Sequence, residues 1–422
     1  MPWLLLALSL WCGLFVINAF RPRTRPPTLA AISFFAGWLT IEVALHHLLW
    51  QVAAFVMLVF HGALEGWPGW VGAALFGSGW AGLLVCAWRS YRTRATVESA
   101  LQAGLGRSYR QRIAPKLAAK LSDRPRLTEL LIPWPLRPRD VERLRDLPFR
   151  EVGGRTLALD VYRSRGWVPG SPALLEVHGG GWVIGDKREQ GLPLMYHLAR
   201  QGWVCVTANY RLSPGATFPE PLEDLKWALR WIREEGPAYG IDPGFVIVTG
   251  QSAGAHLASL LALTAGQAKY QRGFEGVDTS VQGCVSFYGI YDLLDREGDV
   301  PHDGMRRLVE AKFLKARLRD APELFEEASP RFRISAAAPP FLLLHGDRDS
   351  LAPVAGARRF HEALERRSGA PVCFAELVGA QHAFDIFPSL RGALAIRGVE
   401  RFLAALYSDH LAAVARAAEM ED

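Results

Sequence analysis

The stretch Gly250-Gln251-Ser252-Ala253-Gly254 follows the apolar run 245–249 and precedes a second apolar segment at 255–261. The first run has the length of a buried strand, and the second continues as a helix. Glycines two positions before and after Ser252 allow a sharp strand-to-helix turn, which a β-carbon would obstruct. This turn lifts the Ser252 hydroxyl out of the sheet, beside the free N–H groups of the helix N-terminus. The pattern predicts an α/β fold with an activated serine.

A run of three glycines follows another strand-like segment. His178-Gly179-Gly180-Gly181-Trp182 comes directly after residues 173–177. Consecutive glycines leave backbone N–H groups accessible, and acyl transfer needs preorganised donors for its tetrahedral oxyanion. We predict that the N–H groups of Gly180, Gly181 and Ala253 form this oxyanion hole, supported by His178, Gly179 and Gln251. The alternative is a flexible glycine turn.

Two aspartates compete for the role of the acid. The apolar run 340–344 leads into His345-Gly346-Asp347-Arg348-Asp349. An acid after a strand lies at the same carboxyl edge of the sheet as the serine turn. We favour Asp349 because it lies farther into the loop, before a Leu-x-Pro segment that can open a helix. Asp347 is expected to hold the loop through hydrogen bonds from its side chain to the backbone.

His382 is the candidate base, because it lies in the loop after the strand-like run 372–377. The chain order Ser252, Asp349, His382 is the Ser…Asp…His order of α/β-hydrolases. His256, one helical turn after Ser252, is expected to pack beneath the serine turn.

Together these motifs resemble the hormone-sensitive-lipase-like branch of the α/β-hydrolases over residues 147–408. The matching segments are the HGGGW run at 178–182, residues 209–214, 218–219 and 222–224, the serine turn at 250–254, the HGDRD run at 345–349, and His382. The resemblance implies an α/β-hydrolase fold that cleaves carboxylic esters without a metal or organic cofactor.

Two departures leave the substrate open. The family often has Asp or Glu where this chain has Gln251, and Ala-Pro-Glu where it has Ser213-Pro214-Gly215. Gln251 with the trailing Ala255-His256 also resembles isoprenylcysteine methylesterases and kynurenine-formamidase-like hydrolases. An acyltransferase could use the same acyl-enzyme, with a hydroxyl in place of water. An inactive receptor on this fold is a third class, but it usually loses the serine or the histidine.

The spacing of the apolar runs predicts the body of a catalytic domain at 147–410. A hairpin around Gly153-Gly154 and six further runs give eight strands. Their continuous apolar character indicates a mainly parallel sheet covered by helices on both faces. The six runs are 173–177, 203–208, 245–249, 281–287, 340–344 and 372–377. A helical excursion at 291–338 should shape specificity, a helix at 391–408 closes the domain, and residues 411–422 form a tail.

The first 94 residues have the composition of an all-α transmembrane domain. Apolar spans are expected at 3–20, within 29–60, and at 70–88. A single helix over 29–60 would extend about 48 Å, which is longer than one bilayer core, so we expect one span with an interfacial extension. A cleaved signal peptide is the alternative for residues 1–20, but a basic n-region is missing. Glu42 and His46 share one helix face and are functional candidates within a membrane.

Arginines flank these spans. Three lie at 21–25 and three at 89–94. If basic residues stay inside, three spans place the catalytic domain in the cytoplasm, whereas a tight hairpin within 29–60 would place it outside. The partners expected are a lipophilic ester, of short to medium acyl length or amphiphilic, and the lipid membrane. Residues 95–146 form an amphipathic linker that lies either on the headgroups or over the active site as a lid.

Charge and cysteines exclude other classes. The net charge of +6 is spread along the 422 residues without a stacking-aromatic or arginine-rich motif, so we expect no nucleic-acid partner. The five cysteines have neither metal-ligand nor disulfide spacing. They read as small buried apolar residues, so no metal is expected.

Overall fold

An eight-stranded sheet organises the larger part of the protein, in a computed structural model that describes residues 1–301 and 303–421. The strand order is β1-β2-β4-β3-β5-β6-β7-β8. β1 and β2 pair antiparallel, as do β2 and β4, and every other pairing is parallel. The strands are β1 Val141–Val152, β2 Arg155–Ser164, β3 Ser171–Val177, β4 Val204–Ala208, β5 Ile241–Gln251, β6 Gly283–Phe287, β7 Phe341–Gly346 and β8 Val372–Leu377. The expected α/β class with a mainly parallel eight-stranded sheet is confirmed.

Helices cover both faces of the sheet because its central strands are apolar on both sides. α9 Glu220–Glu234, α10 Ala253–Leu263 and α13 Val354–Arg367 bury side chains in one core cluster. α8 Leu192–Gln201 and α14 Leu390–Glu421 bury theirs in the other. The excursion before β7 contains α11 Gly304–Leu308, a π-helical turn Val309–Phe313 and α12 Pro322–Glu327. Short 3-10 turns lie at Gly236–Tyr239, Ala268–Tyr270 and Pro330–Phe332.

The register brings the carboxyl ends of four parallel strands to one edge. Gln251 of β5 pairs with Phe287 of β6, and Phe287 pairs with Leu344 of β7. Gly346 of β7 pairs with Leu377 of β8. The loops that follow these strands therefore meet along this edge.

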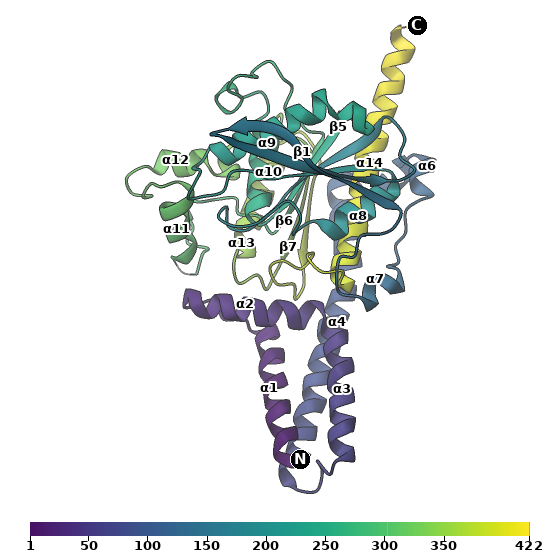
Figure 1. Cartoon of the computed structure of the whole chain (residues 1–422), viewed down its shortest axis with the longest axis vertical. Coiled ribbons are helices and arrows are strands. Elements are labelled where there is room, and N and C mark those ends of the chain that lie inside the picture. The colour runs from purple at the N-terminus through teal and green to yellow at the C-terminus, as the bar shows by residue number, and fades with distance from the viewer. Residues whose placement is uncertain (302, 422) are drawn as a thin grey trace.

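Four N-terminal helices form a stalk and a crossbar below the sheet domain (Figure 1). They are α1 Pro2–Phe20, α2 Pro27–Glu42, α3 Ala44–Phe60 and α4 Trp67–Leu105. α1, α3 and α4 run along the stalk, and α2 lies across its upper end, beneath the sheet domain. α1 and α4 are each long and apolar enough to cross a membrane, and the pair α2–α3, bent by 83°, would make a third span if counted as one.

Several element boundaries differ from the expectations. The segment 29–60 breaks at Val43, so that only its second half runs along the stalk. α4 continues past residue 88 to Leu105, because its last turns pack on β8 and α14. The segment up to β1 holds three short helices, α5 Tyr109–Arg112, α6 Pro115–Ala118 and α7 Leu127–Leu131. α14 runs on to Glu421 through the segment expected to be a tail.

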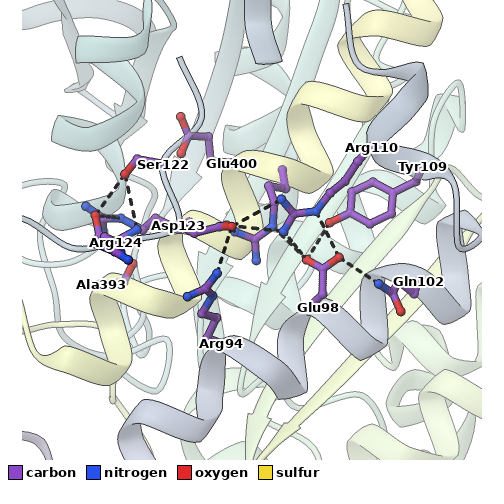
Figure 2. Close-up of polar contacts among 12 residues, drawn as sticks. Arg94, Glu98, Gln102, Tyr109, Arg110, Ser122, Asp123, Arg124, Ala393 and Glu400 are labelled. Carbon is purple, nitrogen blue, oxygen red and sulfur yellow. Dashed lines mark hydrogen bonds and ion pairs between the residues drawn. The ribbon is translucent and has the colours of Figure 1, made fainter. Parts of the chain in front are cut away.

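An ion-pair network joins α4 to this segment and to α14 (Figure 2). Glu98 of α4 accepts hydrogen bonds from Arg110 at 2.7 Å and from the Tyr109 hydroxyl at 2.9 Å. Asp123 pairs with Arg94 of α4 at 3.2 Å and with Arg401 of α14 at 2.7 Å. The upper end of α4 is thereby fixed to the sheet domain.

Candidate active site

Ser252 lies at the turn between β5 and α10, in the positive-φ region at φ 56° and ψ −119°. Such a conformation is strained for a residue with a β-carbon and persists only where the surroundings impose it. Here the Ser252 N–H donates to the Phe287 carbonyl at 3.0 Å, and the Ser252 carbonyl accepts the His256 N–H at 3.0 Å. A β-carbon at Gly254 would lie 2.0 Å from the Val177 carbonyl oxygen, so only glycine allows α10 to approach the end of β3.

The glycine loop after β3 is anchored from both ends. The Gly179 N–H donates to Gln190 at 2.8 Å, and Trp182 stacks on Phe313 with ring centroids 4.4 Å apart. Gly180 adopts φ 114°, which an L side chain disfavours. Among the described residues, the N–H groups of Gly180 and Gly181 donate no hydrogen bond, so both remain available to a ligand. Ala253 is the first residue of α10, where the N–H has no partner within the helix.

His178 and His256 are buried supports. His178 Nδ1 hydrogen-bonds to the Gly179 carbonyl at 2.8 Å, and its ring stacks on Tyr210 at 4.4 Å. His256 Nδ1 accepts from the Trp182 indole at 3.2 Å, and its Nε2 hydrogen-bonds to Ala328 O at 2.7 Å. Burial lowers the pKa of His256 to about 4, so it stays neutral.

Asp349 and His382 form a buried pair. His382 Nδ1 and Asp349 Oδ2 are 2.6 Å apart, and His345 Nε2 lies 3.3 Å from the same oxygen. Asp349 Oδ1 accepts the N–H groups of residues 351 and 352 at 2.9 and 2.7 Å. Burial by itself would raise the pKa of Asp349, but the two histidines hold it well below its ordinary value, so the carboxylate is charged.

Asp347 has different partners. Its Oδ1 accepts the Gly379 N–H at 2.7 Å, at the start of the loop that carries His382. Asp347 therefore braces this loop and leaves the imidazole to Asp349.

Gln381 ties the acid loop to the histidine loop. Its side-chain oxygen accepts the Ser350 N–H at 2.7 Å and the His382 N–H at 2.9 Å. Sequence reasoning missed this residue, and its position next to His382 was the only available signal.

Tyr288 connects the serine turn to His382 and was also missed. It follows Phe287, whose carbonyl holds Ser252, and its ring centroid lies 4.5 Å from that of His382. Tyr288 has φ 40°, and its hydroxyl donates a short hydrogen bond to the buried Asp385. Tyr288 thus contacts the His382 ring and directly follows the residue that holds the Ser252 N–H.

Two further buried acids, Glu176 and Asp385, lie beside the Gln251 side chain. Glu176 accepts the Thr207 hydroxyl at 3.0 Å, and the Gln251 side chain lies beside both Glu176 and Asp385. Burial raises the pKa of Glu176 to about 8 and that of Asp385 to about 6. A neutral amide at 251 adds no third acidic group to this buried cluster, which gives a physical reason for the departure from Asp or Glu at this position.

Sequence comparison identifies relatives over most of the chain. Esterase LipQ of Mycobacterium tuberculosis is 36% identical over 393 residues, which cover 91% of this chain and 86% of LipQ. The probable carboxylic ester hydrolase LipM of the same organism is 38% identical over 399 residues, covering 93% and 90%. The chain belongs to this family of α/β-hydrolase esterases.

The esterase also matches the family described as BD-FAE over residues 159–364. That range contains Ser252 and Asp349 and ends before His382. A truncated carbohydrate esterase from gut microbiota has a TM-score of 0.54 at 20% identity, covering 63% of this chain and 96% of that chain. This likeness supports the fold alone. The esterase is a carboxylic ester hydrolase, as the resemblance implied.

The esterase has no cluster of three or more His, Cys, Asp or Glu side chains able to hold a metal ion within residues 1–301 and 303–421. Its five cysteines are free and buried.

Proposed function

We propose that this esterase cleaves lipophilic carboxylic esters at a membrane surface through a triad of Ser252, His382 and Asp349. The observation that carries the triad is the 2.6 Å contact between His382 and Asp349 at the edge where β5 presents Ser252. The charged Asp349 selects the His382 tautomer with a proton on Nδ1, which leaves Nε2 free to accept the serine proton.

The reaction then runs in two halves. Ser252 Oγ attacks the ester carbonyl while His382 takes its proton, and the N–H groups of Gly180, Gly181 and Ala253 stabilise the oxyanion. The alcohol leaves with the proton from His382. Water, deprotonated by His382, then releases the acid from the acyl-enzyme.

The catalytic mechanism is tested by labelling the full-length protein with a fluorophosphonate and following p-nitrophenyl ester turnover. We expect Ser252→Ala to abolish labelling and to lower kcat by roughly 10⁶-fold. The matched control is Ser259→Ala in α10, whose hydroxyl donates to the Ala255 carbonyl at 2.7 Å. Equal labelling of Ser252→Ala and wild type would disprove the assignment.

Membrane anchoring is proposed from the stalk. α1 and α4 each contain an apolar stretch long enough to cross a membrane, and many of their large apolar side chains are exposed. Trp3 and Trp67 meet at one end of the stalk at 5.4 Å, and Arg89 packs over Phe20 at 4.8 Å at the other end. Aromatic residues at one end and arginines at the other are typical of membrane interfaces, with the arginine end in the cytoplasm.

The substrate class follows from this arrangement. The loop that carries His382 contacts α2, which lies across the end of the stalk (Figure 1), so an ester dissolved in lipid would reach the site from that side. Membrane fractions washed with alkaline carbonate test the anchoring, because an integral protein stays in the pellet. Protease treatment of sealed vesicles from either side tests the cytoplasmic orientation.

A further inference from the structure

α2 contacts the loop that carries His382. The Trp38 indole N–H donates to the Ala383 carbonyl at 2.8 Å, across 345 positions of the chain. Ala383 follows His382 directly and adopts φ 64°, a conformation that is strained for alanine. A strained backbone persists only where its surroundings hold it, and the Trp38 hydrogen bond is one such constraint.

The same helix packs on the imidazole itself. The Phe34 ring lies edge-on to the His382 ring, with centroids 6.0 Å apart and planes at 77°, and Phe34 is buried. Trp38 stacks on Phe34 at 5.6 Å and on Phe387 at 4.7 Å. The loop 382–387 is therefore held by α2 at His382, at Ala383 and at Phe387.

A buried ion pair at the end of α2 fixes this helix to the sheet domain. Glu42, at its end, pairs with the fully buried Arg391 at 2.9 Å and accepts the Ser389 hydroxyl at 2.8 Å. Arg391 also donates to Ser90 of α4 at 3.2 Å. The opposite face of α2 exposes apolar side chains, namely Leu29, Ile32, Phe35 and Leu39. One face of α2 thus belongs to the catalytic domain, and the other is free to contact lipid.

We propose that Trp38 and Phe34 are positioning residues of the active site, which fix the orientation of His382 from the N-terminal helical region. This inference rests on the proposed triad. The helical region of the first 60 residues then does more than attach the protein to a membrane. α2 holds the loop that carries His382, and Ser252 is fully activated only when α2 packs against this loop.

The expected effect lies in the chemical step. Loosening His382 impairs proton transfer in the transition state, while contacts made by the bound ester are unchanged. We therefore expect Trp38→Phe, which removes the indole N–H and keeps an aromatic ring, to lower kcat by roughly tenfold with KM within about twofold. Phe34→Ala should lower kcat at least as much, and Phe34→Leu should restore part of the loss.

The experiment uses the full chain in one detergent. It measures kcat and KM for p-nitrophenyl butyrate and the rate constant of Ser252 phosphonylation by a fluorophosphonate. Each rate is divided by the concentration of protein that the fluorophosphonate has labelled when the reaction is complete, so that misfolded protein is not counted. Trp50→Phe makes the same chemical change on α3, where the indole bonds to His47 at 3.0 Å. Ile32→Ala is the control on the outward face of α2.

The outcomes separate this inference from the proposed function. A fall in kcat and in phosphonylation rate for the Trp38 and Phe34 variants, with both controls near wild type, supports it. Wild-type kcat in Trp38→Phe and Phe34→Ala overturns it, as does a rise in KM at unchanged kcat. Failure of the proposed function would give a different result: Ser252→Ala would keep the kcat and the fluorophosphonate labelling of the wild-type protein.

Discussion

At the scale of single residues, two aspartates separated by one position have different tasks. Asp349 contacts His382, whereas Asp347 accepts the N–H of Gly379. The exchange of either for asparagine keeps the shape and removes the charge, so the pair gives a matched comparison.

We expect Asp349→Asn to lower kcat by roughly 10³- to 10⁴-fold, because an amide no longer selects the His382 tautomer. Asp347→Asn should cost less than about tenfold, since it only weakens one backbone contact. Steady-state kinetics with p-nitrophenyl butyrate on both variants checks the assignment. A larger loss in Asp347→Asn would reverse it.

The buried Glu176 predicts a pH dependence of stability. Its pKa is raised to about 8, against roughly 4.3 in an unfolded chain. Between these values the native state binds a proton that the unfolded state lacks. The stability from this group is therefore complete below about pH 4 and is lost as the pH rises through 8.

Glu176→Gln imitates the protonated form at every pH. We expect it to match wild type near pH 4 and to be more stable at pH 9, by up to about 5 kcal/mol. Denaturant unfolding at the two pH values measures the difference. Glu235→Gln, at an exposed position, should show no such trend. If the unfolding free energies of Glu176→Gln and wild type differ by the same amount at pH 4 and at pH 9, this would argue against a neutral Glu176.

At this scale the sequence does not reveal contacts between residues that lie far apart along the chain. Motif spacing predicted Ser252, Asp349 and His382. It could not predict the roles of Gln381 and Tyr288. Gln381 accepts a hydrogen bond from Ser350, 31 positions away, and Tyr288 donates one to Asp385, 97 positions away. Such partners have no local pattern, because only the strand register brings them together.

At the scale of elements, the turn between β5 and α10 requires glycine at 254. A β-carbon there would meet the carbonyl oxygens of Val177 and His178 at 2.0 and 2.6 Å. We expect Gly254→Ala to displace α10, to destabilise the fold by about 1–3 kcal/mol or more, and to abolish fluorophosphonate labelling. Thermal unfolding together with labelling measures both effects.

Gly356→Ala is the control within a helix. A β-carbon at this position in α13 meets no atom within 4 Å. Its expected effect is a gain of roughly 0.5–1 kcal/mol, because alanine loses less backbone entropy than glycine in a helix. Intact labelling in Gly254→Ala would mean that the turn tolerates a β-carbon.

Element types were predictable and element ends were not. Continuous apolar runs indicated the buried parallel strands correctly. α4 continues to Leu105 through arginine-rich sequence that looks like a linker, because tertiary packing on β8 and ion pairs stabilise a polar helix. Local sequence carries no information about that partner.

At the scale of the whole molecule, the buried pair of Glu42 and Arg391 joins the helical region to the catalytic domain. We expect Glu42→Gln to lower stability by about 3–5 kcal/mol, because it leaves the Arg391 charge buried without its counter-ion. Thermal unfolding in a fixed detergent or nanodisc measures this loss.

Asp409→Asn serves as the comparison. It breaks a pair with Arg112 whose side chains are 46% and 50% exposed, so the cost should stay below about 1 kcal/mol. Equal effects of the two substitutions would show that the Glu42 pair does not hold the two parts together.

The sequence by itself determined the α/β-hydrolase class, the candidate triad, the glycine loop and the apolar character of the N-terminal helices. These features are encoded in short motifs and in hydrophobic periodicity, which act over a few residues. Only the tertiary structure decided that Glu42 pairs with Arg391 and that α2 lies on the His382 loop. Those contacts join residues more than 340 positions apart, and their energy depends on burial that no local pattern contains.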